Sequence, residues 1–201
     1  MTLTLLPLFP LDLVLLPGVL LPLHIFEPRY QEMIGECLAQ KKPFGVVRAL
    51  EEGIVSIGCT AEIISVTKKY DDGRMDIVTR GVHRFEVLEV NEERSFLQAE
   101  IVVVEDQPGR AAAELIEQAV RIHAEIKRAA AGSFENEAEG ANEAEPAENL
   151  SFHLAGSLPL DLDFKQNLLT TLSEAKRMEA VVEYLRAILP GLRRASKARW
   201  N

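Results

Sequence analysis

The chain has 201 residues, of which 47% are hydrophobic and 26% charged, and its formal net charge is −9. A chain of this length and composition buries a core without disulfide or metal support, which excludes disorder as a description of the whole chain. The acidic balance argues against a nucleic-acid partner, because that binding relies on Lys and Arg side chains that neutralise phosphates.

The first apolar run, residues 3–26, is long enough to be mistaken for a membrane span, but it contains prolines at positions 7, 10, 17 and 22. Each proline inside a helix would cost about 3 kcal/mol, which excludes a spanning helix. No Lys or Arg precedes the run and no small-residue cleavage site closes it, so no secretory signal is expected. We therefore expect a soluble, cytoplasmic protein. The strands predicted in this run cover residues 3–6, 13–16 and 19–23.

A helix is predicted to begin at Pro28, where the missing N–H costs nothing, and to stop before Pro43. The sequence Asp71-Asp72-Gly73 tolerates a hairpin turn between two segments rich in β-branched residues. At least six strands are expected before residue 105. Those that follow the helix cover residues 44–50, 56–70, 74–80, 85–87 and 97–103.

The second half of the chain is predicted to be helical, which favours an α+β arrangement. Helical spacing of apolar residues is found at 110–131, 150–155 and 164–172, and again in a last helix from Ser173 to Pro190-Gly191. Residues 132–149 contain six Glu and no Lys or Arg. This composition predicts a mobile acidic loop.

No pattern of catalytic, metal-binding or cofactor-binding residues is found. The four histidines lack metal-ligand spacing, and no phosphate-binding glycine loop or nucleophile elbow is present. Cys37 and Cys59 are expected to be two buried thiols, although an oxidising compartment would permit a disulfide. We expect no enzyme activity, no metal and no cofactor.

Several motifs follow one another along the chain: Leu-Pro-Leu-Phe-Pro-Leu at 6–11, Leu-Pro-Gly at 16–18, Leu-Pro-Leu-His-Ile-Phe-Glu-Pro-Arg-Tyr at 21–30, Pro-Phe-Gly-Val-Val at 43–47, Gly-Cys-Thr-Ala-Glu-Ile at 58–63, Asp-Gly-Arg at 72–74 and Arg-Gly-Val-His-Arg-Phe at 80–85. This ordered series resembles the Lon protease N-terminal domain family, especially its short stand-alone bacterial members. In many members the strand that corresponds to residues 58–63 reads Gly-Thr-x-Ala, from which Cys59 departs.

The resemblance implies a PUA-like six-stranded β-barrel with one short helix over residues 1–108, followed by an α-helical bundle over residues 109–201. It also implies a protein-binding module that takes polypeptide partners, including unfolded segments, and has neither ATPase nor peptidase. For partner contact, the sequence offers Arg29 and Tyr30 on the first helix, and Arg80 and Arg84 beside Gly81.

Two other functions remain open on the sequence. An RNA-binding module is one alternative, since other PUA-like barrels bind RNA and residues 193–199 form a basic tail. The overall charge opposes it. An unrecognised hydrolase is the other, and it would need a deep pocket with converging titratable groups.

Overall fold

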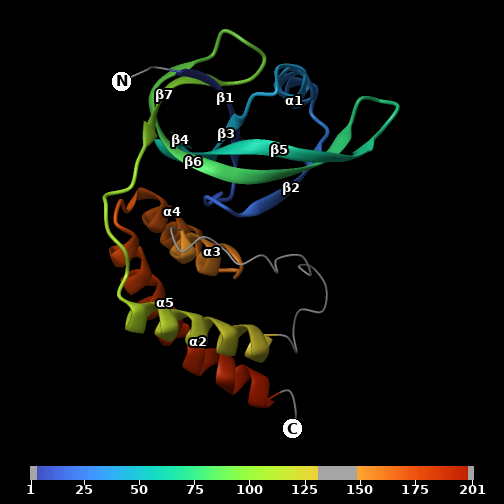
Figure 1. The fold of residues 1–201 in the computed structure, drawn as a ribbon. Helices are drawn as coiled ribbons and strands as arrows, with labels where there is room; N and C mark the ends of the chain where they lie inside the picture. The colour runs from blue at the N-terminus through green and yellow to red at the C-terminus, as the bar shows by residue number, and fades with distance from the viewer. Residues whose placement is uncertain (1–3, 131–148, 199–201) are drawn as a thin grey trace. The chain divides into compact units, whose positions relative to one another are not determined.

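The computed structural model describes residues 4–130 and 149–198 and contains a β-sheet and five helices (Figure 1). Apart from Asn149, the predicted acidic loop at 132–149 lies outside the described residues. The strands are β1 (Thr4–Leu11), β2 (Leu20–Ile25), β3 (Phe44–Leu50), β4 (Gly53–Ile54), β5 (Ile57–Lys69), β6 (Met75–Asn91) and β7 (Gln98–Val104). The helices are α1 (Pro28–Gln40), α2 (Ala113–Ala130), α3 (Leu150–Gly156), α4 (Leu162–Thr170) and α5 (Glu174–Ala198).

The chain divides into two compact units. The first consists of Met1–Glu105 and Leu160–Thr170, and the second of Asp106–Pro159 and Thr171–Asn201. The strands, α1 and α4 thus belong to the first unit, while α2, α3 and α5 form the second. The sequence-based boundary between residues 108 and 109 remains a prediction.

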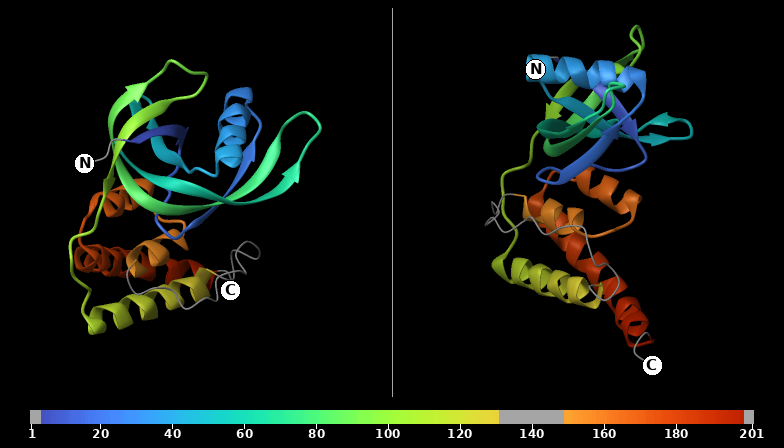
Figure 2. Two further views of the ribbon diagram at one scale, coloured as in Figure 1. Left: turned by 45° about the horizontal axis from the view of Figure 1, so that its top comes forward. Right: turned by 90° about the vertical axis from the view of Figure 1, so that its right-hand side faces the viewer.

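All seven strands of the first unit belong to one sheet. β1 pairs with β7 in antiparallel and with β3 in parallel orientation, and β3, β5, β6 and β7 pair in succession. The pairing therefore runs from β1 through β7, β6, β5 and β3 back to β1, with β2 added along β6. Figure 2 shows α1 on one side of these strands and the β5–β6 hairpin extending beyond them. The predicted six-stranded barrel with one helix is not confirmed, since the sheet has seven strands and α4 packs with it.

One expected strand is absent from the sheet. Residues 13–16 carry no strand, although Leu15 and Leu16 are buried. Two neighbouring leucines can fill a core from an irregular segment as well as from a strand. The apolar pattern at residues 13–16 therefore indicated burial correctly but did not show that the segment pairs with a strand. In contrast, the predicted hairpin is confirmed, because β5 pairs with β6 and the turn contains Gly73 at φ 88°.

The core of the first unit is built around the Phe85 ring, which is fully buried. Gly45 and Gly58 lie against it, and a Cβ on either residue would come within 2.7 Å of the Phe85 Cζ atom. These two glycines leave the volume that the ring fills. The side chains packed with Phe85 belong to Leu6, Leu8, Val47, Ala99 and Ile101.

Helix α4 is attached to the strands by polar contacts from three of its residues. Leu169 offers its carbonyl oxygen to the Arg84 guanidinium at 3.0 Å, and the Gln166 amide donates to the Ile57 carbonyl at 3.0 Å. Asp163 accepts a hydrogen bond from the Arg48 guanidinium at 2.5 Å. These bonds explain why a helix expected in the helical half of the chain belongs to the first unit.

Both cysteines are buried free thiols, as expected. Burial raises the pKa of Cys37 to about 11, with Glu36 adding to the shift. Burial also raises the pKa of Cys59, to about 12, against the opposing effects of a Val82 backbone hydrogen bond and of Arg84. Both thiols are therefore protonated and unreactive at neutral pH.

The second unit packs α2 along α5, and its apolar core comes from the facing stripes of these helices. Helix α5 continues through Pro190 to Ala198, contrary to the predicted end at Pro190-Gly191. The residues beyond Pro190 are mostly good helix formers, and Arg193 forms an ion pair with Glu125 of α2. The buried residues of the stripes are Ala119, Ile122, Ile126, Met178, Val181, Val182, Leu185 and Leu189.

A buried ion network centres on Arg177 of α5, whose side chain is fully enclosed. Its guanidinium donates to both carboxylate oxygens of Asp106, at 2.8 and 2.5 Å, and to Glu174 at 2.8 Å. Glu174 in turn accepts the backbone N–H and the hydroxyl of Ser151 at the start of α3. Burial acts to lower the pKa of Arg177, but Asp106 and then Glu174 raise it, which keeps the charge in place. The network ties three segments of the unit together.

Candidate functional site

The exposed side of β2 and the adjoining part of β6 forms a surface that we call the β2 face. β2 pairs with β6, and residues directly opposite one another share a face. Leu20 lies opposite Arg80, Pro22 opposite Val78, and His24 opposite Asp76. These six residues and the neighbouring Phe26 define the β2 face: Leu20, Pro22, His24, Phe26, Asp76, Val78 and Arg80.

Apolar side chains at both ends of β2 are open to solvent. Leu20 is 49% exposed and Phe26, directly after the strand, is 58% exposed. The Phe26 ring stacks on His24 with 5.9 Å between ring centroids and 19° between planes. The backbone carbonyl oxygen of Phe26 accepts a hydrogen bond from the Gln31 side chain at 3.0 Å, which fixes Phe26 between β2 and α1. The β2 face thus exposes apolar side chains on a backbone that is fixed by hydrogen bonds.

A polar network borders this apolar surface at its His24 end. The His24 Nδ1 atom lies 2.5 Å from Asp76 Oδ1, and the Tyr70 hydroxyl donates to Asp76 Oδ2 at 2.9 Å. The hydrogen bonds from His24 and then Tyr70 lower the pKa of Asp76, so the carboxylate stays ionised at neutral pH. The Lys68 ammonium and the Arg74 guanidinium lie 4.4 and 4.9 Å from the Tyr70 ring centroid. Cations therefore flank this end.

The structure separates the four residues that the sequence offered for partner contact. Arg80 is exposed on the β2 face. Arg29 is exposed on α1, paired with Glu27 at 2.8 Å and 4.6 Å from the Tyr30 ring centroid. Tyr30 is buried, and its ring packs on Phe9 with 4.1 Å between centroids. Partner contact at these positions remains a prediction, and the geometry favours Arg80.

Arg84 is only 4% exposed, although it lies four residues after the exposed Arg80 on the same strand. Residues four apart on a regular strand share a face. Between Gly81 and Arg84, however, β6 has one residue more than the facing part of β5, which is a β-bulge. The His83 amide donates to Thr60 Oγ1 at 2.9 Å within this bulge. The extra residue turns Arg84 into the interior, where it contacts α4.

Of the β2 face the sequence reasoning offered only Arg80, and it missed Leu20, Pro22, His24, Phe26, Asp76 and Val78. They were interpreted as strand and scaffold residues, because an apolar alternation does not show which side of a strand is covered. The available signal was Pro22, since proline within a strand indicates an edge.

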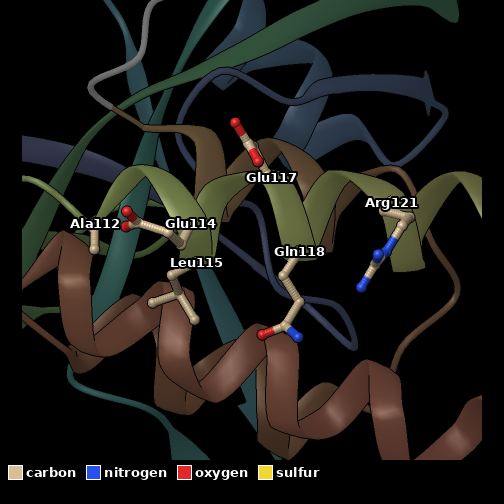
Figure 3. A pocket seen from close by; sticks show the side chains of 6 residues that line it. All are labelled: Ala112, Glu114, Leu115, Glu117, Gln118 and Arg121. Carbon is tan, nitrogen blue, oxygen red and sulfur yellow. The ribbon is translucent and has the colours of Figure 1, made fainter.

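A hollow of about 530 Å³ lies along α2 of the second unit (Figure 3). Its lining residues all belong to α2 or directly precede it. Leu115 and Gln118 point toward the neighbouring helix, whereas Glu117 points away from it. The lining holds two carboxylates, one carboxamide and one guanidinium, all from this one helix. The lining residues are Ala112, Glu114, Leu115, Glu117, Gln118 and Arg121.

Another titratable group with a shifted pKa lies in the second unit. His123 is buried in the second unit, and its Nε2 lies 2.6 Å from the Ser157 hydroxyl. Burial, and then Lys127 and His153, lower the pKa of His123 to about 4, so this histidine is neutral at neutral pH. Among residues 4–130 and 149–198, no group of three metal-ligating side chains is present. No described helix is both long and apolar enough to cross a membrane.

The sequence matches the family described as the ATP-dependent protease La (LON) substrate-binding domain over residues 5–187. It is 30% identical over 197 residues to a Lon protease of Anaeromyxobacter dehalogenans, covering 90% of this chain, and 25% identical over 185 residues to Lon protease 1 of Hydrogenovibrio crunogenus, covering 86%. The chain spans only 23% and 22% of those two proteins.

Solved structures of Lon N-terminal domains have the same fold. A Lon N-terminal domain protein from Xanthomonas campestris superposes with a TM-score of 0.70 at 25% identity, covering 90% of this chain and 98% of that one. The N-terminal domain of a Mycobacterium avium complex Lon protease gives a TM-score of 0.63 at 18% identity, covering 91% of this chain and 98% of that one.

Proposed function

We propose that this chain, which belongs to the family of ATP-dependent protease La (LON) substrate-binding domains, binds unfolded polypeptide segments through its β2 face. The observation that carries the proposal is the pair of exposed apolar side chains, Leu20 on β2 and Phe26 directly after it, where the Gln31 side chain holds the Phe26 backbone by a hydrogen bond. Unfolded segments differ from folded proteins chiefly in the apolar side chains they expose. Such segments are selected because binding buries their apolar side chains together with those of the β2 face.

The available apolar area sets the strength of such binding. Full burial of a Leu or Phe side chain is worth about 1.5–3 kcal/mol, and roughly half of each side chain is still exposed here. The two residues together then contribute about 1.5–3 kcal/mol, or a factor of roughly 10–150 in affinity. Binding driven by this face is accordingly weak and reversible, as suits a module that samples many sequences.

We further propose that the module is non-catalytic and works in the cytoplasm of a bacterium. The chain matches the substrate-binding part of Lon proteases, which is not their catalytic part. The buried, protonated Cys37 and Cys59 suit a reducing compartment. The PUA-like barrel implied by the resemblance is also part of the proposal, supported by the pairing circuit that returns to β1.

The test is a titration of fluorescently labelled, reduced and carboxymethylated lactalbumin, a permanently unfolded polypeptide, followed by anisotropy. We expect saturable binding by the wild-type chain and at least tenfold weaker binding by the double variant Leu20→Ser/Phe26→Ser, because the apolar contribution is lost. The matched control, Leu50→Ser/Val120→Ser, removes similarly exposed apolar side chains outside the β2 face and should bind as the wild type does.

Two outcomes would contradict the proposal. One is the absence of saturable binding by the wild-type chain. The other is an equal loss of affinity in both double variants, which would place the binding elsewhere or make it unspecific. Binding of single-stranded RNA at low salt, with none of polypeptide, would favour the alternative of an RNA-binding module.

A further inference from the structure

β2 has one free edge. Among the described strands it pairs with β6 alone, so the backbone groups on its other edge make no ladder. The Gly81 N–H donates to the Val19 carbonyl at 3.0 Å, and the Thr79 hydroxyl donates to the Leu21 carbonyl at 2.9 Å. The carbonyl oxygens of the odd-numbered residues Val19 and Leu21 therefore point toward β6.

The alternate residues of β2 direct their backbone groups to the free edge. In an antiparallel pair, hydrogen-bonded and non-hydrogen-bonded positions alternate along the strand. Leu20, Pro22 and His24 are the non-hydrogen-bonded positions and present three carbonyl oxygens, with two N–H groups from Leu20 and His24. Proline is found in strands where its missing N–H would face away from the ladder, and Pro22 occupies such a position.

We propose that an extended polypeptide segment binds by adding to this free edge as a further β-strand. The inference rests on the proposed function and names how the same face holds its ligand. From Leu20 to His24 the strand covers about 13 Å, so a segment of about five residues is long enough to pair with the backbone groups at the free edge. Backbone hydrogen bonds do not depend on sequence, which suits a module that accepts many segments.

The side chains beside the edge define the chemistry of the segment. Leu20, Pro22 and Phe26 favour alternating apolar residues in the added strand. Arg80 takes part in none of the ion pairs found among the described residues, whereas Lys68 lies against the Tyr70 ring and its charge helps to lower the pKa of Asp76. The segment that fits is therefore extended, apolar at alternate positions, and carries at least one carboxylate within reach of Arg80.

Backbone amide hydrogen exchange of the full chain tests this directly. The exchange rates are measured by NMR with and without saturating reduced and carboxymethylated lactalbumin. We expect the amides of Leu20 and His24 to exchange at least tenfold more slowly in the complex, because they become donors to the added strand. The amides of Leu21 and Leu23, already bonded to β6, serve as internal controls and should change little.

A pair of variants gives a second readout. Leu20→Ala shortens the side chain but keeps the N–H, whereas Leu20→Pro also removes the donor at the free edge without touching the β6 ladder. We expect Leu20→Pro to weaken binding at least threefold more than Leu20→Ala, with the Leu23 amide still protected in both variants.

Binding of lactalbumin without slower exchange at Leu20 and His24 would overturn strand addition and leave the proposed function standing. No binding at all would overturn both. Should Leu20→Pro fail to fold, the exchange rates of the wild-type chain decide the question alone.

Discussion

Replacing Arg177 with methionine is expected to lower the free energy of unfolding by about 3–5 kcal/mol. The guanidinium is fully enclosed and is the shared partner of Asp106 and Glu174. Methionine fills similar volume but leaves the buried Glu174 carboxylate without its cation. Removing one partner of a buried ion network costs more than the network contributes, because the remaining charge is stranded away from water. Urea unfolding followed by circular dichroism measures the change.

The matched control for this prediction is Arg193→Met, which removes an ion pair in the same unit. Arg193 contacts Glu125 from an exposed position on α5. Exposed pairs contribute about 1 kcal/mol or less, so this variant should unfold close to the wild-type midpoint. If both variants lower the free energy of unfolding equally, the burial of Arg177 does not explain how much this residue contributes to stability.

Replacing Gly58 with alanine is expected to destabilise the first unit by about 2–3 kcal/mol, the cost of overpacking a filled core. The added Cβ would lie 2.6 Å from the Phe85 Cζ atom and 2.6 Å from the Val46 carbonyl oxygen. The ring can shift only against other buried side chains, and the carbonyl belongs to the neighbouring strand. The change in unfolding midpoint is again followed with urea.

A double variant and a control identify the cause of this effect. Phe85→Leu should cost less in the Gly58→Ala background than in the wild type, because the smaller side chain relieves the clash between the new Cβ and the Phe85 ring. Gly35→Ala is the control, since a Cβ there meets nothing within 4 Å and Gly35 lies inside α1. It should stabilise the chain by about 0.5–1 kcal/mol. Destabilisation by Gly35→Ala similar to that by Gly58→Ala would contradict the packing explanation.

Local signals predicted the elements that depend on local chemistry. The hairpin at Asp71-Asp72-Gly73 forms because Gly73 accepts a positive φ, and α1 begins at Pro28 because the proline needs no donor there. The irregular path of residues 13–16 could not be predicted, since buried leucines look alike in a strand and in a loop. The pairing circuit joins β1 to both β3 and β7, and such long-range contacts leave no periodic signal in the sequence.

The candidate site was predictable only in part for the same reason. Arg80 and Arg84 look equivalent in the sequence, yet one bulge in β6 exposes the first and buries the second. Whether a side chain such as Phe26 is covered depends on elements distant in the chain. Sequence motifs indicated the family. The exposed β2 face could not be identified from them, because it depends on the pairing of β2 with β6.

Site-specific photo-crosslinking tests the central claim, that unfolded polypeptide binds at the β2 face, most directly. A benzophenone amino acid replaces Phe26 in one variant and Leu50 in another, both exposed in the first unit. After irradiation with reduced and carboxymethylated lactalbumin, we expect a covalent adduct from position 26 and little or none from position 50. Equal capture at both positions, or capture at position 50 alone, would contradict the assignment of binding to the β2 face.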